Sequence, residues 1–321
     1  MSVKLTMKQP YQKARLFPKK FRGYIDLLRP FTLVAPFFVS MFIMFASLVF
    51  NDKFGAYPDW WITIGQASLT LVFLNGASNA LNQATDVDAD RISKPYRPIP
   101  RGVVDREEAQ SIAYLFYLFA LLRAVTINTW FGIFVFLIMI FTVTYSLPPR
   151  MKRYLFLNQT WIAIPRGLFA VLASWSVFGD PFQKEPLLIG AIAMIFFMGA
   201  MTTKDIVDAE ADTKTGTHTL INIFGIRKAA YISVPFLVIP FAAVPFFVHF
   251  YIMNSYFLPL TLFVFPGFII FYLMLKQQES KTLENVQAWS LMYVTYLFYA
   301  IGFTSLIIFG ELGYLNFLTP I

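Results

Sequence analysis

Residues 61–90 read WITIGQASLTLVFLNGASNALNQATDVDAD, an apolar stretch that runs directly into three aspartates. The apolar part, residues 61–82, has the roughly 20 residues that a helix needs to cross a bilayer. Carboxylates are costly near hydrocarbon, so acids at the end of such a helix indicate a functional site by default. The stretch therefore predicts a membrane-embedded helical protein and marks the helix end that carries its chemistry.

The composition extends this prediction to the whole chain. Of its 321 residues, 57% are hydrophobic and only 14% are charged, whereas about a quarter of the residues in a soluble domain are charged. The absence of Cys excludes disulfides and thiolate metal sites. The only two histidines, His218 and His249, argue against a histidine metal centre or a Ser-His-Asp triad. We therefore expect an integral, multi-pass membrane protein without a sizeable soluble domain.

Nine segments of the chain are apolar enough to be membrane spans. Each is close to the length that a bilayer requires, so the predicted fold is an all-α polytopic membrane protein with nine transmembrane helices. The segments lie at about 30–50, 61–82, 109–127, 130–148, 157–178, 186–204, 228–250, 256–275 and 287–309.

Two acid clusters lie at the ends of predicted spans, and in both the acids recur at helical spacing. The first has an i, i+4, i+8 pattern within NQATDVDAD at residues 82–90, and the second has i, i+3, i+7 within KDIVDAEAD at residues 204–212. Each pattern aligns its side chains on one helix face, and two such faces together would form an all-oxygen site suited to Mg²⁺ with a diphosphate. The candidate metal ligands are Asn82, Asp86, Asp90, Asp205, Asp208 and Asp212.

The distribution of positive charge predicts the orientation. Cytoplasmic loops of membrane proteins carry an excess of Lys and Arg. With a cytoplasmic N-terminus, 22 of the 26 Lys and Arg fall inside and only Lys53, Arg123 and Lys184 fall in outer loops. The C-terminus is then outside. Four spans separate the two acid clusters, so both clusters and the active site are expected on the cytoplasmic side.

The net charge of +8 follows the same distribution, so it does not indicate a nucleic-acid partner. Residues 1–24 form a basic N-terminal tail that anionic headgroups would attract. Residues 25–321 are expected to form a single transmembrane domain in contact with the lipid bilayer.

Basic residues accompany the acids. The loop RISKPYRPIPRG at residues 91–102 presents Lys94, Arg97 and Arg101 beside the first cluster. Acids bind Mg²⁺, Mg²⁺ bridges phosphate oxygens and bases take the remaining negative charge, so this mixture suits a metal–diphosphate complex. The alternative is that these bases only satisfy the positive-inside rule.

Three further bases complete the diphosphate candidates. Lys152 follows a Pro-Pro break at the cytoplasmic end of the fourth span, and Lys204 adjoins the second acid cluster. Arg166 is the only base within a predicted span and should face a polar cavity or an acid. Its roles open at this point are phosphate binding, acceptor binding and a buried structural ion pair.

At these residues the chain resembles the UbiA superfamily of intramembrane prenyltransferases. That family has two motifs of the form Asp-x-x-Asp-x-x-x-Asp, a Lys-Pro-x-Arg-Pro-Ile-Pro-x-Gly loop and a Tyr-Ser-x-Pro-Pro-x-x-Lys segment. One departure is Gln83, where many members have Asp. The matching segments are residues 82–90, 94–102, 145–152 and 205–220.

The resemblance implies a fold and an activity. The nine helices would surround a central cavity under a cap of cytoplasmic loops, with two Mg²⁺ ions and an isoprenyl diphosphate donor, such as geranylgeranyl diphosphate. An allylic cation would form as diphosphate leaves, protected from water, and a lipophilic acceptor would attack it. Asp86 and Asp208 would be catalytic, and Tyr145 would stabilise the cation.

Two other functions remain as alternatives. A cation-coupled transporter would use the carboxylates as an ion relay, but it predicts acids near the bilayer midplane and access from both sides. A CDP-alcohol phosphatidyltransferase would keep its acids in one continuous stretch. The acceptor of a prenyltransferase also stays open, between an aromatic or quinone precursor and an isoprenylglyceryl phosphate.

Overall fold

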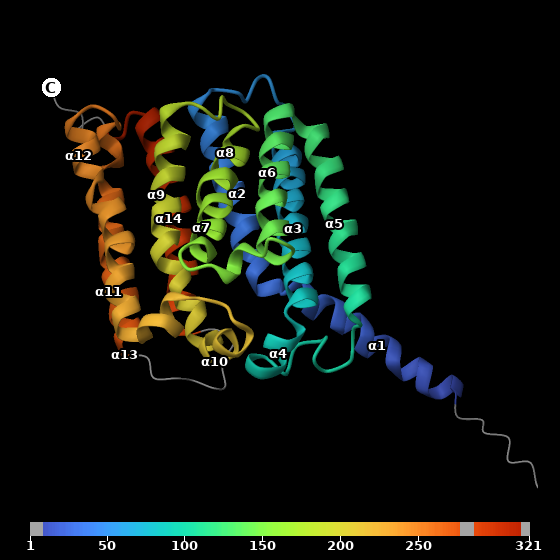
Figure 1. The fold of residues 1–321 in the computed structure, drawn as a ribbon. Helices are drawn as coiled ribbons and strands as arrows, with labels where there is room; N and C mark the ends of the chain where they lie inside the picture. Colours follow the sequence, from blue (N-terminus) through green and yellow to red (C-terminus); the bar gives the residue numbers. More distant parts are fainter. Residues whose placement is uncertain (1–8, 277–285, 316–321) are drawn as a thin grey trace, which may run out of the picture.

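The computed structural model describes residues 9–276 and 286–315, and within these ranges every regular element is a helix. The helices run side by side as a bundle (Figure 1). The first half comprises α1 (Gln9–Leu28), α2 (Pro30–Phe50), α3 (Trp60–Thr85), α4 (Val87–Ser93), α5 (Arg106–Ile127), α6 (Thr129–Ser146), η1 (Met151–Arg153), α7 (Leu157–Ala163), η2 (Ile164–Phe169) and α8 (Ala170–Trp175). The second half comprises α9 (Lys184–Ala200), η3 (Met201–Lys204), α10 (Asp205–Thr215), α11 (Leu220–Ala242), α12 (Val244–His249), η4 (Ser255–Phe263), α13 (Val264–Lys276) and α14 (Gln287–Glu311).

Seven helical segments of the described chain are long and apolar enough to cross a bilayer. They correspond to seven of the nine predicted spans, so an all-helical, multi-pass membrane protein is confirmed. The other two predicted spans are also largely helical, but one is more polar than the seven and the other is not a single regular helix. Helix α3 carries five Asn and Gln side chains, and the predicted span at residues 157–178 is divided among α7, η2 and α8, which end at Trp175. The nine-span topology and the orientation of the termini stay predictions.

Helix α3 packs against α5 along a face of small residues. The buried side chains of α3 include Ala67, Ala77 and Ala80, and those of α5 include Ala113 and Ala120. Small side chains let two helix backbones approach closely in a membrane, where the packing itself drives association. This packing explains how a helix as polar as α3 lies inside the bundle, because its Ala face meets α5 while Asn79 and Gln83 donate to backbone oxygens of α1.

Two hydrophobic cores meet at α2 and α8. One core is built mainly from α9, α11, α13 and α14, and the other from α3, α5 and α6. Helix α2 contributes Ile43 to the first core and Met44 to the second. Helix α8 likewise contributes Val171 to the first and Leu172 to the second. These two helices therefore join the halves of the bundle.

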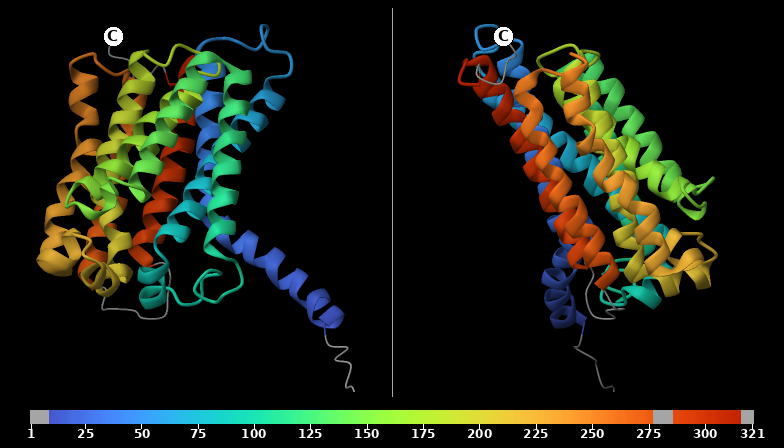
Figure 2. Two further views of the ribbon diagram at one scale, coloured as in Figure 1. Left: turned by 45° about the vertical axis from the view of Figure 1, so that its right-hand side comes forward. Right: turned by 90° about the vertical axis from the view of Figure 1, so that its left-hand side faces the viewer.

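The N-terminal helix α1 extends away from the bundle (Figure 2). In the second half of α1, Lys20 forms an ion pair with Glu108 at the start of α5. The described part of the predicted basic tail, residues 9–24, is thus helical. Residues 1–8 of the tail lie outside the described residues, and so does Lys281, which the charge count placed in a cytoplasmic loop. The division into a tail and one transmembrane domain stays a prediction.

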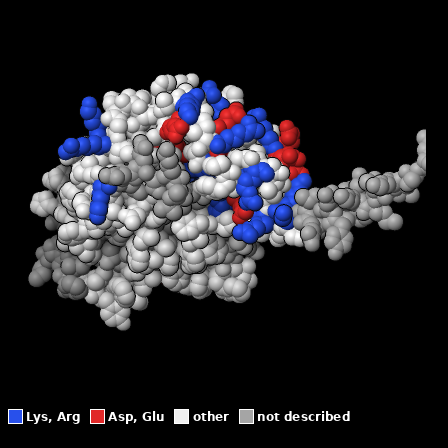
Figure 3. All heavy atoms as spheres, turned by 90° about the horizontal axis from the view of Figure 1, so that it is seen from below, with Lys and Arg blue, Asp and Glu red and all other residues white. Residues whose placement is uncertain are grey.

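Both acid clusters lie at one end of the bundle. Helix α4 follows the first cluster and α10 carries the second, and the two helices contact each other. They occupy the lower end in Figure 1. Seen from that end, Lys, Arg, Asp and Glu side chains gather over part of the face (Figure 3). The four spans predicted between the two acid clusters place both clusters at one end of the bundle, as observed. A cation-coupled transporter would instead have its acids near the bilayer midplane.

Candidate active site

A cavity of about 470 Å³, here called the acid cavity, opens at this end between the two clusters. Its lining includes all six residues predicted as metal ligands, together with Tyr145 and five of the six predicted diphosphate-binding bases. The exception is Arg101, which is exposed and lines a neighbouring pocket beside Gln83 and Arg97. The fold thus collects residues that are more than a hundred positions apart in the sequence.

The first cluster spans a short interruption between two helices. Helix α3 ends at Thr85, and Asp86 adopts a non-helical conformation before α4 begins. The backbone nonetheless continues its i to i−4 hydrogen bonds, from Asp86 N to Asn82 O at 3.0 Å and from Asp90 N to Asp86 O at 2.8 Å. The expected alignment of Asn82, Asp86 and Asp90 is therefore kept through the interruption.

The second cluster lies on one continuous helical run. The 3-10 turn η3 leads directly into α10, where Asp205 and Asp208 occupy the first turn. Gly216 ends α10 with φ 70°, a left-handed conformation that glycine adopts at little cost. Asp205 is buried and accepts a hydrogen bond from Asn158 Nδ2 at 3.3 Å.

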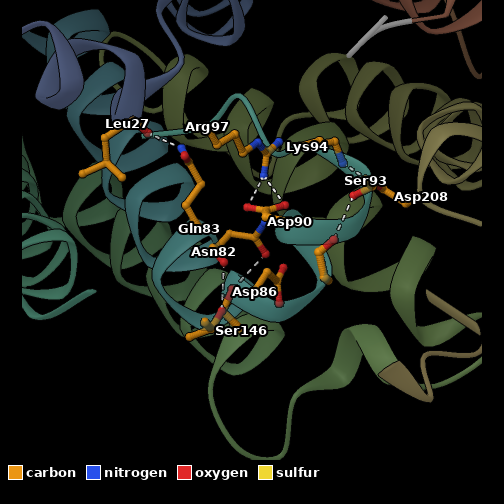
Figure 4. Close-up of polar contacts among 12 residues, drawn as sticks. Leu27, Asn82, Gln83, Asp86, Asp90, Ser93, Lys94, Arg97, Ser146 and Asp208 are labelled. Carbon is orange, nitrogen blue, oxygen red and sulfur yellow. Dashed lines mark hydrogen bonds and ion pairs between the residues drawn. The ribbon is translucent and has the colours of Figure 1, made fainter. Parts of the chain in front are cut away.

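The acids pair with the bases that surround them. Arg97 Nη1 donates to both carboxylate oxygens of Asp90, at 2.9 and 2.8 Å (Figure 4). Asp86 pairs with Lys152 and with Arg150 Nη2, the latter at 3.1 Å. The other two pairs are Lys94 with Asp208 and Lys204 with Asp205. Lys94 follows the first acid cluster, so its pair with Asp208 joins the two clusters directly.

Burial shifts the titration of the site. It raises the pKa of the Asp90 carboxyl above its ordinary value, an effect that the Arg97 guanidinium opposes. It also lowers the pKa of the Lys152 ammonium, which Asp86 opposes. Among the described residues, no three Asp, Glu, His or Cys side chains converge as a ready-made metal site. Four acids of the cavity, Asp86, Asp90, Asp205 and Asp208, are instead each paired with a base.

Gln83 lies outside the acid cavity although it adjoins Asn82 in the sequence. Its side chain is 1% exposed, and Nε2 donates to the backbone oxygen of Leu27 at 2.6 Å. Figure 4 shows it directed toward Leu27 and away from Asp86. Gln83 therefore attaches α3 to the end of α1, and the departure from the family motif does not alter the set of acids that face the cavity.

Several cavity residues were not among the predicted metal ligands or diphosphate-binding bases. Arg150 pairs with Asp86, and Asn158 contacts Asp205 while its own Oδ1 is buried without a partner. Arg29 lines the acid cavity with a left-handed backbone, φ 54°, directly before Pro30. The polar spacing Asn75, Asn79, Asn82 was a usable signal, since it continues the cavity-facing side of α3 toward the bundle interior. The other residues have no such pattern in the sequence.

A second cavity of about 180 Å³, here called the apolar chamber, continues from the acid cavity into the bundle. Its walls include apolar side chains of α2, α3, α6 and α8. The two cavities share the residues Arg29, Asn79, Asn82, Tyr145, Ile162, Arg166, Lys204 and Tyr293. A charged site thus adjoins a largely apolar compartment inside the bundle.

The sequence and the fold both match known proteins. The model of the UbiA prenyltransferase family matches residues 40–294. The chain belongs to the UbiA prenyltransferase family. It is accordingly a membrane-embedded enzyme that transfers an isoprenyl group, and the resemblance predicted from the motifs is confirmed.

Individual UbiA relatives cover most of the chain. A digeranylgeranylglyceryl phosphate synthase of Methanosphaera stadtmanae is 25% identical over 87% of this chain and 98% of its own length. A homogentisate solanesyltransferase of Arabidopsis thaliana is 28% identical over 85% of this chain and 74% of its own length. The solved structure of a UbiA homolog from Archaeoglobus fulgidus, bound to GPP and Mg²⁺, superposes with a TM-score of 0.65 at 18% identity, covering 88% of this chain and 99% of that one. The shared fold is that of UbiA enzymes.

Proposed function

We propose that this UbiA enzyme transfers an isoprenyl group from a polyprenyl diphosphate to a lipophilic acceptor within the membrane, with Mg²⁺ as cofactor and diphosphate as second product. The observation that carries the proposal is the junction of two cavities. An acid cavity lined by carboxylates and bases opens into an apolar chamber. A donor with a charged head and a hydrocarbon tail has the same division.

The acid cavity suits Mg²⁺ bound together with a diphosphate. Mg²⁺ prefers oxygen ligands and is commonly held by one or two carboxylates plus substrate phosphates. The two clusters offer carboxylate and amide oxygens in two separated groups, without a ready-made cage of three acids. We infer two ions, one at Asn82, Asp86 and Asp90 and one at the acids of α10, completed by the diphosphate. The ions would neutralise charge on the departing diphosphate.

The bases have a distinct role in this proposal. Lys94, Lys152 and Lys204 lie beside the acids and would bind diphosphate oxygens, stabilising the negative charge as the bond between C1 and oxygen breaks. The bond electrons leave with the diphosphate. Tyr145 lines both cavities, with Lys152 5.8 Å from its ring centre, so its ring would face the allylic cation near C1.

The orientation follows from the charges. The excess of Lys and Arg at the acid end favours a cytoplasmic active site, where soluble diphosphates are available. We propose nine spans with the N-terminus inside, counting α3 and the divided segment α7–η2–α8 as membrane-embedded. The bundle then forms one transmembrane domain, with the N-terminal residues as an accessory at the cytoplasmic surface.

The relatives support this donor class. A UbiA homolog from Archaeoglobus fulgidus was solved with GPP and Mg²⁺, and a structure of a UbiA homolog from the same organism holds DMAPP and Mg²⁺. The relatives' names include both a glyceryl phosphate synthase and homogentisate prenyltransferases. We propose a geranylgeranyl donor or one of similar length. The named relatives divide between two acceptor classes.

The test is prenyl transfer by the protein in nanodiscs. Radiolabelled geranylgeranyl diphosphate would be supplied with aromatic acids and with geranylgeranylglyceryl phosphate, in Mg²⁺ and in EDTA. We expect a prenylated product only in Mg²⁺. Absence of both product and Mg²⁺-dependent donor binding would refute the proposal.

A further inference from the structure

Helices α1 and α2 meet at a joint formed by Arg29. This residue has a left-handed backbone, with φ 54° and ψ 69°, directly before the proline that begins α2. Such a conformation is costly for a residue with a side chain, and it persists only where the surrounding structure fixes it. The carbonyl groups at the end of α1 also lack partners within their own helix. The joint therefore needs support from another segment of the chain.

Amide side chains of α3 supply this support. Gln83 Nε2 donates to Leu27 O at 2.6 Å, as Figure 4 shows. Asn79 Nδ2 donates to both Leu28 O and Thr32 Oγ1, each at 2.8 Å. A third amide follows at the same spacing, i, i+4 and i+8, so the three side chains lie along one helix face. We call them the amide ladder: Asn75, Asn79 and Gln83.

Asn79 holds the Arg29 backbone from both sides. On one side it binds the oxygen of the preceding residue, Leu28. On the other side it binds the Thr32 hydroxyl, which itself donates to Arg29 O at 2.8 Å. Both N–H groups of the Asn79 amide are thus in use, and Asn79 and Thr32 are only 6% and 3% exposed. These buried bonds fix the direction in which the Arg29 side chain leaves the joint.

The third amide of the ladder connects the joint to Arg166. Asn75 Nδ2 donates to Thr32 O, and Asn75 Oδ1 accepts from Arg166 Nη2, both at 3.2 Å. Arg166 Nη1 donates to the Tyr293 hydroxyl at 2.7 Å. Within the described ranges, no carboxylate lies within 4.0 Å of Arg166, unlike the paired lysines of the acid cavity. The structural ion pair that the sequence left open is therefore not formed by these residues, and one face of α3 supports two arginines.

Arg29 lies where the cavities of the acid end meet. It lines the acid cavity, the apolar chamber and the neighbouring pocket of about 370 Å³ that contains Arg101. In the proposed function the donor passes from the acid cavity into the chamber, so the diphosphate oxygen bonded to C1 would lie beside Arg29. A guanidinium binds phosphate oxygens through N–H groups in a fixed fork, so its affinity depends on its direction.

We propose that the amide ladder is a positioning element for the donor. By fixing the α1–α2 joint, Asn79 and Gln83 set the direction in which Arg29 meets the diphosphate. The inference rests on the proposed function, because it names residues that act through Arg29 on the same donor. Gln83 is also the position at which this chain departs from many UbiA members. An ionised aspartate there has no N–H to donate to Leu27 O, so the departure has a role at the joint.

Donor binding tests the inference, in the full-length protein in nanodiscs with Mg²⁺. Isothermal titration gives the Kd of geranylgeranyl diphosphate, and the Kd of inorganic pyrophosphate as a probe of the charged head alone. Arg29→Gln should raise both Kd values by about 10- to 100-fold, the range for a hydrogen bond to a charged group. Asn79→Leu keeps the volume of the side chain but removes its donors, and it should raise both values by about 10-fold.

A double-mutant cycle distinguishes positioning from an independent effect. If Asn79 acts through Arg29, adding Asn79→Leu to Arg29→Gln should change the donor Kd by less than about 2-fold. Effects that multiply would instead show that the two residues act separately, which would overturn the inference. An unchanged Kd in either single variant would overturn it as well.

Thr32 offers a second route if Asn79→Leu does not fold. Thr32→Val removes the hydroxyl that joins Asn79 to Arg29 O, so it should raise the donor Kd by about 5-fold. Thr32→Ser keeps the hydroxyl and should stay within about 2-fold of the parent. Equal Kd values for the two variants would contradict the proposed role.

Asn128→Leu is the matched control. Asn128 Nδ2 also donates to a distant backbone oxygen, that of Ser176, at 2.8 Å, but Asn128 lines none of the three cavities. It should lower the thermal stability and leave the donor Kd unchanged. A rise in Kd equal to that of Asn79→Leu would assign the effect to destabilisation and overturn the inference. Mg²⁺-dependent donor binding and prenyl transfer by the unaltered protein would keep the proposed function in each case, whereas their loss would refute both.

Discussion

The acid cavity and the apolar chamber adjoin each other, but their charged side chains have different kinds of partner. In the acid cavity, bases and acids neutralise one another, as in the pair of Arg97 with Asp90. At the boundary of the chamber, the two side chains to which the Arg166 guanidinium donates, Tyr293 and Asn75, are neutral. Paired charges suit a site that exchanges its partners for a metal–diphosphate complex, while neutral partners fix the position of the Arg166 guanidinium without neutralising its charge. The comparison teaches that neighbouring cavities of one enzyme can be built for chemically different parts of one substrate.

The strongest break in this comparison is removal of Asp208. Asp208→Asn deletes a predicted metal ligand and separates Lys94 from its acid partner, so turnover should fall on the order of 1000-fold. Prenyl transfer in nanodiscs measures the loss, with thermal unfolding as a check of folding. The matched control is Asp59→Asn at the opposite end of α3, which should keep full activity. Near-normal activity of Asp208→Asn would remove Asp208 from the metal site.

Metal removal tests the acid cavity as a whole. With EDTA, donor binding and turnover should both be lost, and added Mg²⁺ should restore them, because carboxylates alone would repel a diphosphate. Isothermal titration of geranylgeranyl diphosphate with and without Mg²⁺ measures the effect directly. Donor binding of equal strength in EDTA would contradict the proposed cofactor.

A third change tests the pairing itself. Arg97→Met leaves the Asp90 carboxylate buried without its base, and breaking a buried pair in this way costs about 3 kcal/mol of folding free energy. Thermal or chemical unfolding in detergent gives the value. The double variant Arg97→Met with Asp90→Leu should recover much of the loss, since it removes the lone charge. A single variant as stable as the parent would show that the pair contributes nothing to the fold.

The smallest expected effect concerns the chamber. Ala170 lines it, so Ala170→Phe should shorten the space for a prenyl chain. The ratio of kcat/KM for geranylgeranyl over geranyl diphosphate should fall by about 10-fold, the discrimination that a few methylenes provide in an apolar pocket. Competition between the two donors measures the ratio. An unchanged ratio would place the prenyl chain elsewhere.

The sequence was most informative where periodicity and hydropathy act alone. The apolar length of residues 30–50 predicted α2 at its observed bounds, and the helical spacing of acids predicted that residues such as Asp86 and Asp208 line one cavity. Long apolar runs have few alternatives in a bilayer, so these features follow from local composition.

The remaining features depend on tertiary packing. The π turn at Ile164–Phe169 divides a segment that hydropathy treats as one span. Gln83 and Asn82 are adjacent polar residues, yet only Asn82 faces the cavity, because Leu27 accepts the Gln83 amide. Arg101 belongs to the same basic loop as Arg97, but the loop turns it toward another pocket. No spacing rule encodes such directions, since they arise from contacts between distant segments.

The ion pair between Lys94 and Asp208 has one more consequence under the proposed function. A cation that takes Asp208 releases Lys94, and an anion that takes Lys94 releases Asp208. Each ligand therefore removes the competitor of the other, and by thermodynamic reciprocity each must strengthen the binding of the other by the same factor. The pair thus makes the binding of Mg²⁺ and diphosphate positively cooperative. Either ligand alone binds weakly, and the two together separate Lys94 from Asp208.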